Sequence, residues 1–403
     1  MKKLSLAILL IGLLISTKSF NQKFEGLALT PPMGWNSWNK FSCDVSEDLI
    51  KGMADAMVST GMKDAGYEYI VIDDCWQTGR DSLGNIMPDP KRFPSGMKAL
   101  ADYIHAKGLK FGIYSDAGMK TCAGRPGSRG YEFQDARTYA SWGIDYLKYD
   151  WCATGTQNAP ASYKLMSDAI YKAGRPIVLS ICEWGNNEPW KWGAEVGHLW
   201  RTTGDIYHCY DCVLNHGTWN QWGWTVILDM QHKLREYNGP DHWNDADMME
   251  VGNGMSVTED RAHFTLWCML ATPLMAGNDI VNMSKEIQEI LTNKEAIAIN
   301  QDPKGIQGLR YLYDDNVEVW AKPLENDELA FCFFNRSDIP QDINFKWDKQ
   351  RVEDGISKTD IYVNKTEYKV RDIWAAKDLG TTKNTSLKRT IPPHDVILIK
   401  LSK

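Results

Sequence analysis

Short apolar runs alternate with stretches of helical spacing along the first three quarters of the chain. Eight of these runs are rich in β-prone residues, and most of them end in polar or acidic residues. The runs are residues 33–38, 67–74, 109–116, 144–150, 176–183, 198–205, 240–247 and 272–279. Strands that alternate with helices pair in parallel through right-handed crossovers, so the pattern predicts a (β/α)₈ barrel. The alternative is an open doubly wound sheet, although the first run is not followed by a Gly-rich phosphate-binding turn.

The stretches between the runs show the apolar spacing of helices. Ser46 is a predicted N-cap because two acidic residues follow it in the first turn. Apolar residues then recur every four positions, at Leu49, Met53 and Met57. Further helical stretches span residues 97–106 and 263–270.

The pattern changes after about residue 308. Short alternating runs at residues 317–320, 329–334, 343–347, 360–363 and 396–401 are separated by turn residues, with no helical stretch between them. This predicts an antiparallel all-β domain, a sandwich, behind an α/β barrel. We expect the catalytic barrel to span residues 25–305 and the β domain residues 309–403, and we interpret the β domain as a packing domain.

The N-terminus has the pattern of a signal peptide. Two lysines precede the apolar run 4–15, and small polar residues follow it. The run is too short to span a bilayer. We therefore expect a signal peptide over residues 1–19 and export to the periplasm or the medium, where disulfides are permitted.

Composition narrows the class of partner. The chain of 403 residues is 43% hydrophobic and 24% charged, as in globular proteins. A net charge of −7 and the lack of a basic run argue against nucleic acid as a partner, and we expect no membrane partner. The 17 tryptophans can fill a core, and exposed indoles can also serve as flat platforms for sugars. The sequence does not indicate an oligomeric state.

The nine cysteines cannot all pair within the chain, so at least one is free. Cys209 and Cys212, with His208 and His216 beside them, invite a zinc interpretation. No second Cys/His pair stands at the usual spacing, so we expect no metal and no cofactor.

Acidic residues end most of the predicted strands, and five of these ends are the segments VIDD, LKYD, SICE, TTGD and NDAD. The C-terminal ends of barrel strands meet at one rim, where five converging carboxylates would repel one another unless a site used them. Carboxylates and basic groups hold sugar hydroxyls through charge-assisted hydrogen bonds, and cleavage of a glycosidic bond requires two carboxyl groups. A metal-dependent hydrolase would be expected to carry a His-x-His on the first strand, which here reads Trp35-Asn36-Ser37.

Several long motifs extend this interpretation to a family. PPMGWNSWNKFSC, IDDCW, GIYSDAGMKTCAG, LKYDWC, CEWG, WRTTGDI, WNDADM and IAINQDP together resemble the α-galactosidases (melibiases) of glycoside hydrolase family 27, of the plant and microbial type. The resemblance runs from about residue 27 to the C-terminus. It implies a (β/α)₈ barrel with an antiparallel β domain. It also implies retaining hydrolysis of terminal α-D-galactosyl residues through a covalent galactosyl-enzyme intermediate.

The resemblance also implies roles for individual residues. Asp150 is similar to the family's nucleophile and Asp205 to its general acid/base. The implied galactose-binding residues are Trp38, Asp73, Asp74, Tyr114, Lys148, Glu183, Trp184, Arg201 and Asp247. Alternation along a strand points Lys148 to the same side as Asp150, where a cation would keep Asp150 ionised, while burial would favour a protonated Asp205. The family pairs the cysteines as Cys43–Cys75 and Cys122–Cys152; no pairing is implied for the other five.

Three alternatives remain. An α-N-acetylgalactosaminidase of the same family has small residues where Glu183 and Trp184 stand, because it needs space at C2 of the sugar. A β-L-arabinopyranosidase is associated with a change in the aspartate pair, which is intact here as Asp73-Asp74. The third is a non-catalytic sugar-binding barrel, which the presence of both Asp150 and Asp205 disfavours.

Overall fold

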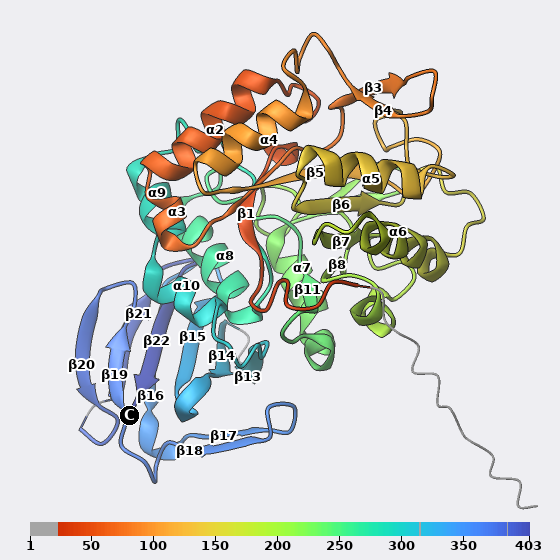
Figure 1. The fold of residues 1–403 in the computed structure, drawn as a ribbon. Coiled ribbons are helices and arrows are strands. Elements are labelled where there is room, and N and C mark those ends of the chain that lie inside the picture. Colours follow the sequence, from red (N-terminus) through yellow and green to blue (C-terminus); the bar gives the residue numbers. More distant parts are fainter. Residues whose placement is uncertain (1–22, 314–315, 385) are drawn as a thin grey trace, which may run out of the picture.

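The computed structural model describes residues 23–313, 316–384 and 386–403 (Figure 1). The predicted signal peptide, residues 1–19, lies outside the described residues. The described part consists of a barrel of strands and helices and a sheet domain that packs beside it (Figure 1).

The barrel is an eight-stranded parallel sheet in the order β11-β8-β7-β6-β5-β2-β1-β12. Each predicted run contains one of its strands, so the predicted (β/α)₈ fold is confirmed. The strands are β1 (Met33–Asn36), β2 (Tyr69–Val71), β5 (Lys110–Asp116), β6 (Tyr146–Asp150), β7 (Val178–Cys182), β8 (Leu199–Arg201), β11 (Trp243–Asp245) and β12 (Leu274–Ala276).

The barrel closes between β11 and β12 just beyond the end of β11. The Ala246 amide donates to Thr272 Oγ1 at 2.9 Å, and the Met249 amide donates to the Met275 carbonyl at 2.7 Å. A parallel bridge between Met249 and Ala276 completes the contact. The segment that carries Asp247 is therefore held against β12 on both sides of that residue.

Helices surround the strands of the barrel, and the short helix α1 (Trp38–Phe41) lies at the rim. The others are α2 (Glu47–Ser59), α3 (Met62–Ala65), α4 (Gly96–Ala106), α5 (Glu132–Trp142), α6 (Ala159–Ala173), α7 (Trp224–Gln231), α8 (Val257–Leu270), α9 (Lys285–Leu291) and α10 (Lys294–Asn300). Ser46 caps α2, as predicted, by accepting the Leu49 amide at 3.2 Å. Helix α8 begins earlier than predicted, because Ser256 and Glu259 form a capping box.

Two hairpins that the sequence pattern did not predict follow barrel strands. Strands β3 (Gln77–Arg80) and β4 (Ile86–Pro88) come after β2, and β9 (Val213–Asn215) and β10 (Asn220–Trp222) come after β8. Both lie at the C-terminal ends of the barrel strands, the end that carries the acidic residues.

The C-terminal domain is antiparallel, as predicted. Its main sheet has the order β13-β14-β15-β22-β19-β20, and two further pairs are β16–β21 and β17–β18. The strands are β13 (Leu309–Tyr313), β14 (Val317–Pro323), β15 (Leu329–Asn335), β16 (Gln341–Lys346), β17 (Arg351–Asp354), β18 (Thr359–Tyr362), β19 (Lys369–Asp372), β20 (Lys377–Thr381), β21 (Ser386–Ile391) and β22 (Val396–Ser402). Strands β14, β15 and β22 pack on α8 of the barrel (Figure 1). No helix among the described residues is long and apolar enough to cross a membrane.

Candidate active site

A cleft opens at the C-terminal ends of the barrel strands. The lining residues are Trp38, Asn39, Asp73, Asp74, Tyr114, Cys122, Lys148, Asp150, Trp184, Arg201, Asp205, Ile206, Gln221, Asp247 and Met248. Every site residue predicted from the sequence is in this set except Glu183. The acidic strand ends therefore do converge on one space.

Asp150 ends β6 and lies buried at the wall of the cleft. Its Oδ2 accepts a hydrogen bond from the Tyr114 hydroxyl at 2.9 Å, and its Oδ1 accepts one from the Trp151 amide at 3.0 Å. Burial raises the pKa of Asp150 to about 6, although the nearby Lys148 charge lowers it. The carboxyl is thus mostly ionised at neutral pH, and its orientation is fixed by two donors.

Lys148 forms its ion pair with Asp73 rather than with Asp150. Its Nζ lies 2.8 Å from Asp73 Oδ2, which also accepts from Asn36 Nδ2 at 2.8 Å. Asp74, next in the chain, accepts the Ala123 amide at 2.9 Å, and burial raises its pKa. The sequence placed Lys148 beside the nucleophile, but it could not show that Asp73 would be its direct partner.

Arg201 connects two further carboxylates of the cleft. Its Nη2 lies 2.6 Å from Asp247 Oδ2 and 3.2 Å from Asp205 Oδ1. The Asp205 side chain is 37% exposed, so the burial expected from the sequence is absent in the free protein. Asp245 accepts the Asp247 amide at 2.9 Å and so fixes the segment that presents Asp247.

Trp184 forms part of the cleft wall from a strained turn. Its φ of 58° lies in the left-handed region, and Gly185 follows with a φ of 79°. A Cβ at Gly185 would lie 2.3 Å from the Thr202 carbonyl oxygen, so only glycine fits there. This turn brings the indole of Trp184 over the cleft.

Glu183 does not line the cleft, which corrects the sequence prediction. It follows β7, where neighbouring side chains point to opposite faces, and both Cys182 and Trp184 face the site. Glu183 Oε2 instead accepts the Asn187 amide and Asn187 Nδ2, both at 2.6 Å. Burial raises the pKa of Glu183 to about 7. Its visible role is to hold the loop that carries Trp184.

Disulfides tie the loops around the site. The implied pairs Cys43–Cys75 and Cys122–Cys152 are confirmed. A third bond, Cys209–Cys212, removes the free thiolates that the zinc interpretation required. Three other cysteines, Cys182, Cys268 and Cys332, are free and buried.

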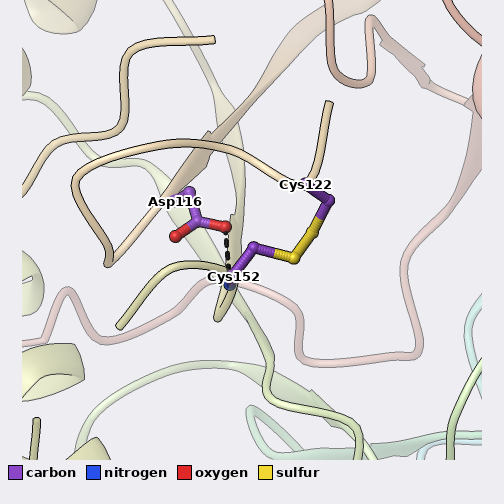
Figure 2. A group of neighbouring side chains, drawn as sticks. All are labelled: Asp116, Cys122 and Cys152. Atoms are coloured by element: carbon purple, nitrogen blue, oxygen red, sulfur yellow. Dashed lines mark hydrogen bonds between the residues drawn. A yellow bond between two sulfur atoms is a disulfide. The ribbon is translucent and has the colours of Figure 1, made fainter. Parts of the chain in front are cut away.

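Asp116 is a buried carboxyl that the sequence analysis did not select. It ends β5, directly beside Asp150 in the parallel register, and its Oδ2 accepts the Cys152 amide at 2.9 Å (Figure 2). Burial, together with the Asp150 charge, raises the pKa of Asp116 to about 9. Cys122 and Cys152 lie next to it, but their sulfurs are bonded to each other and cannot serve as thiolate ligands (Figure 2).

Paired carboxylates and cations in an open cleft on a (β/α)₈ rim are the groups that a sugar-cleaving hydrolase requires. Comparison with known proteins gives the family: the chain belongs to the α-galactosidases of glycoside hydrolase family 27. The family model described as alpha galactosidase A matches residues 30–302, and the model of the alpha galactosidase C-terminal beta sandwich domain matches residues 314–401.

Relatives of the chain are similar over nearly its whole length. Alpha-galactosidase A of Cellvibrio japonicus is 57% identical over 402 residues, covering 100% of this chain and 99% of the relative. Alpha-galactosidase 3 of Arabidopsis thaliana is 44% identical, covering 95% of this chain and 87% of the relative.

Solved structures show the same fold. α-Galactosidase I from Mortierella vinacea aligns with a TM-score of 0.83 at 38% identity, over 93% of this chain and 98% of that one. The α-galactosidase from Saccharomyces cerevisiae, solved with raffinose, aligns with a TM-score of 0.84 at 30% identity, over 93% and 98%.

Proposed function

We propose that this chain hydrolyses terminal α-D-galactosyl residues with retention of configuration, with Asp150 as nucleophile and Asp205 as general acid/base. The observation that carries the proposal is that these two carboxyls line one cleft in different environments. Asp150 is buried and oriented by two hydrogen-bond donors, whereas Asp205 is partly open to solvent.

The two environments suit two roles. In the first step, Asp150 attacks the anomeric carbon while Asp205 gives its proton to the leaving oxygen, and a covalent galactosyl ester forms on Asp150. In the second step, Asp205 takes a proton from water, which attacks the ester and releases galactose. A solvent-accessible Asp205 can be reached by that water, and the Tyr114 hydrogen bond holds Asp150 in line.

The remaining charged groups of the cleft would bind galactose. Asp73, Asp74 and Asp247 can accept hydrogen bonds from sugar hydroxyls, and Lys148 and Arg201 can donate to hydroxyl oxygens. Trp38 and Trp184 offer apolar faces to the ring. Because Lys148 and Arg201 already hold carboxylates in place, the clamp is ordered before the sugar arrives.

A panel of substrates distinguishes this activity from the two alternative glycosidase activities. We expect release of galactose from melibiose and raffinose, and little reaction with α-N-acetylgalactosaminides or β-L-arabinopyranosides. Trp184 lines the cleft and its bulk would exclude an N-acetyl group. Efficient turnover of either alternative substrate, with none of the α-galactosides, would overturn the assignment. No reaction with any member of the panel would favour a non-catalytic barrel.

We also propose that the protein is exported by its N-terminal segment. The support is the signal-peptide pattern of residues 1–19 together with three disulfides near the site. Expression of the full chain followed by N-terminal sequencing of the exported fraction tests this. Retention of an intact N-terminus in the cell interior would contradict it.

A further inference from the structure

The hairpin β9–β10 stands beside the cleft and has no role in the mechanism so far. It is joined to the loop that carries Asp205: the Trp222 amide donates to the Asp205 carbonyl at 3.0 Å, and the Tyr207 amide donates to the Trp222 carbonyl at 2.9 Å. A Cβ at Gly204 would lie 3.2 Å from the Trp222 ring, so the hairpin packs tightly on this loop.

A chain of contacts leads from the cleft to the outer surface of the hairpin. Gln221 lines the cleft, and its Oε1 forms a hydrogen bond with His216 Nε2 at 3.0 Å. The His216 ring in turn stacks on Trp219, with centroids 4.2 Å apart and an angle of 20° between the planes. Trp219 is 49% exposed, more than any other tryptophan in the described residues.

The base of the hairpin is anchored. The Cys209–Cys212 disulfide closes the preceding loop, and the Gly223 amide donates to the Cys212 carbonyl at 2.8 Å. Tyr210, inside this loop, stacks on His394 of the C-terminal domain with centroids 3.8 Å apart. The exposed indole is therefore carried on a fixed support.

From these contacts we infer that Gln221, His216 and Trp219 form a binding site for the leaving saccharide, with the indole of Trp219 as the platform under that sugar. The inference rests on the proposed function, in which Asp205 protonates the leaving oxygen. The hairpin β9–β10 is joined to the Asp205 loop on its solvent side, so its residues would lie beside the leaving saccharide. An amide, an imidazole and an indole offer hydrogen bonds and an apolar face, which suits a neutral sugar unit of a galacto-oligosaccharide.

The test compares substrates with and without a leaving sugar. In Trp219→Ala, kcat/KM for melibiose and raffinose should fall about tenfold, the effect of losing one aromatic contact of ordinary strength. The same constant for α-galactosyl fluoride, whose leaving group is a single atom, should stay within twofold of the wild type. Trp219→Phe keeps a ring and should retain most of the activity on raffinose. Tyr313→Ala, a change of an aromatic side chain 62% exposed in the C-terminal domain, serves as the matched control.

The outcomes separate the two claims. An equal loss with the fluoride and with raffinose would place the effect in the galactose site and overturn the inference, as would no loss with either. A wild-type enzyme that releases no fluoride from α-galactosyl fluoride would instead refute the proposed function, and the inference with it.

Discussion

Two lysines, the half-buried Lys148 on the rim of the barrel and the buried Lys322 between the barrel and the β domain, are held in different ways. Lys148 Nζ faces a carboxylate, 2.8 Å from Asp73 Oδ2. Lys322 Nζ donates to two backbone carbonyls, those of Cys268 at 3.0 Å and Ile299 at 2.6 Å. Burial lowers the pKa of Lys322 to about 8. Burial also acts to lower the pKa of Lys148, but Asp73 and its neighbours raise it well above the ordinary value.

The difference shows that a buried charge alone does not mark a site. Cys268 and Ile299 lie in the last turns of α8 and α10, so Lys322 binds the negative ends of two helices and joins the domains. Lys148 stands instead among opposing carboxylates that line an open cleft. Substitutions at the rim should therefore lower kcat/KM and leave the stability of the fold nearly unchanged. Substitutions at the domain contact should lower the stability of the fold and leave kcat/KM nearly unchanged.

The largest effect is expected for Asp150→Ala. Without a nucleophile no intermediate can form, so kcat should fall by about 10⁴-fold or more, even on aryl galactosides with good leaving groups. The folded-state pKa of about 6 lies above the ordinary 3.8, so the ionised carboxyl destabilises the fold at neutral pH. The melting temperature should accordingly stay level or rise. Activity within tenfold of the wild type would remove Asp150 from the mechanism.

The second prediction distinguishes the roles of the two catalytic carboxylates, Asp150 and Asp205. Asp205→Ala should still form the galactosyl-enzyme from an activated aryl galactoside and then stall, because no base remains to activate water. Burst kinetics would report the first turnover. Added azide, which needs no base, should restore turnover by at least tenfold and yield α-galactosyl azide. If azide left the turnover of Asp205→Ala unchanged while the variant still bound galactose normally, the role of Asp205 as general acid/base would be contradicted.

The lysine pair tests the comparison directly. Lys148→Met should lower kcat/KM by on the order of 10²-fold through loss of a fixed cation in the cleft. Lys322→Met should leave kcat/KM within twofold and lower the free energy of unfolding by about 1–3 kcal/mol, because the buried carbonyls of Cys268 and Ile299 lose the hydrogen bonds from the Lys322 ammonium. Activity assays and denaturant unfolding on both variants give the result. If both variants lost only stability, the distinction between the two regions would fail.

A smaller effect is the pH dependence of stability at Lys322. Its folded pKa of about 8 lies below the ordinary 10.5, so the unfolded chain binds more protons between these two values. Stability from this group should therefore rise as pH rises from about 8 to 10.5, by about 1.4 kcal/mol for each unit of pKa difference. Unfolding of the wild type minus that of Lys322→Met, followed across this range, isolates the group. A flat difference would show that Lys322 is not desolvated.

The sequence predicted the features that follow from two things together, the repeat of apolar strand runs and the topology of the barrel. Apolar runs, most of them with acidic ends, located the eight strands, and parallel closure brought Asp150, Asp205 and Asp247 to one rim. Glu183 was misplaced because it was carried over with the CEWG motif as a whole, whereas alternation from Cys182 turns it away from the cleft. Asp116 ends the predicted run 109–116 but was not selected, because the family resemblance implied no role for it. Trp219 was missed because an exposed indole has no distinguishing pattern in one sequence.

The C-terminal domain shows the same limit. Strands β14, β15 and β22 carry a strong apolar signal because they form the centre of the sheet against α8. Strand β20 reads Lys377-Asp378-Leu379-Gly380-Thr381 and pairs with β19 at the edge of the sheet. The side chains of β20 are exposed or half-buried, so its sequence has little hydrophobic alternation to detect.

The central claim, retention through a galactosyl-enzyme on Asp150, is tested most directly by the anomer of galactose released first. Proton NMR recorded during the first turnovers of raffinose, before mutarotation, distinguishes the two anomers. The roles of Asp150 and Asp205 predict α-galactose as the first product. β-Galactose as the first product would mean a single displacement by water and would contradict the account.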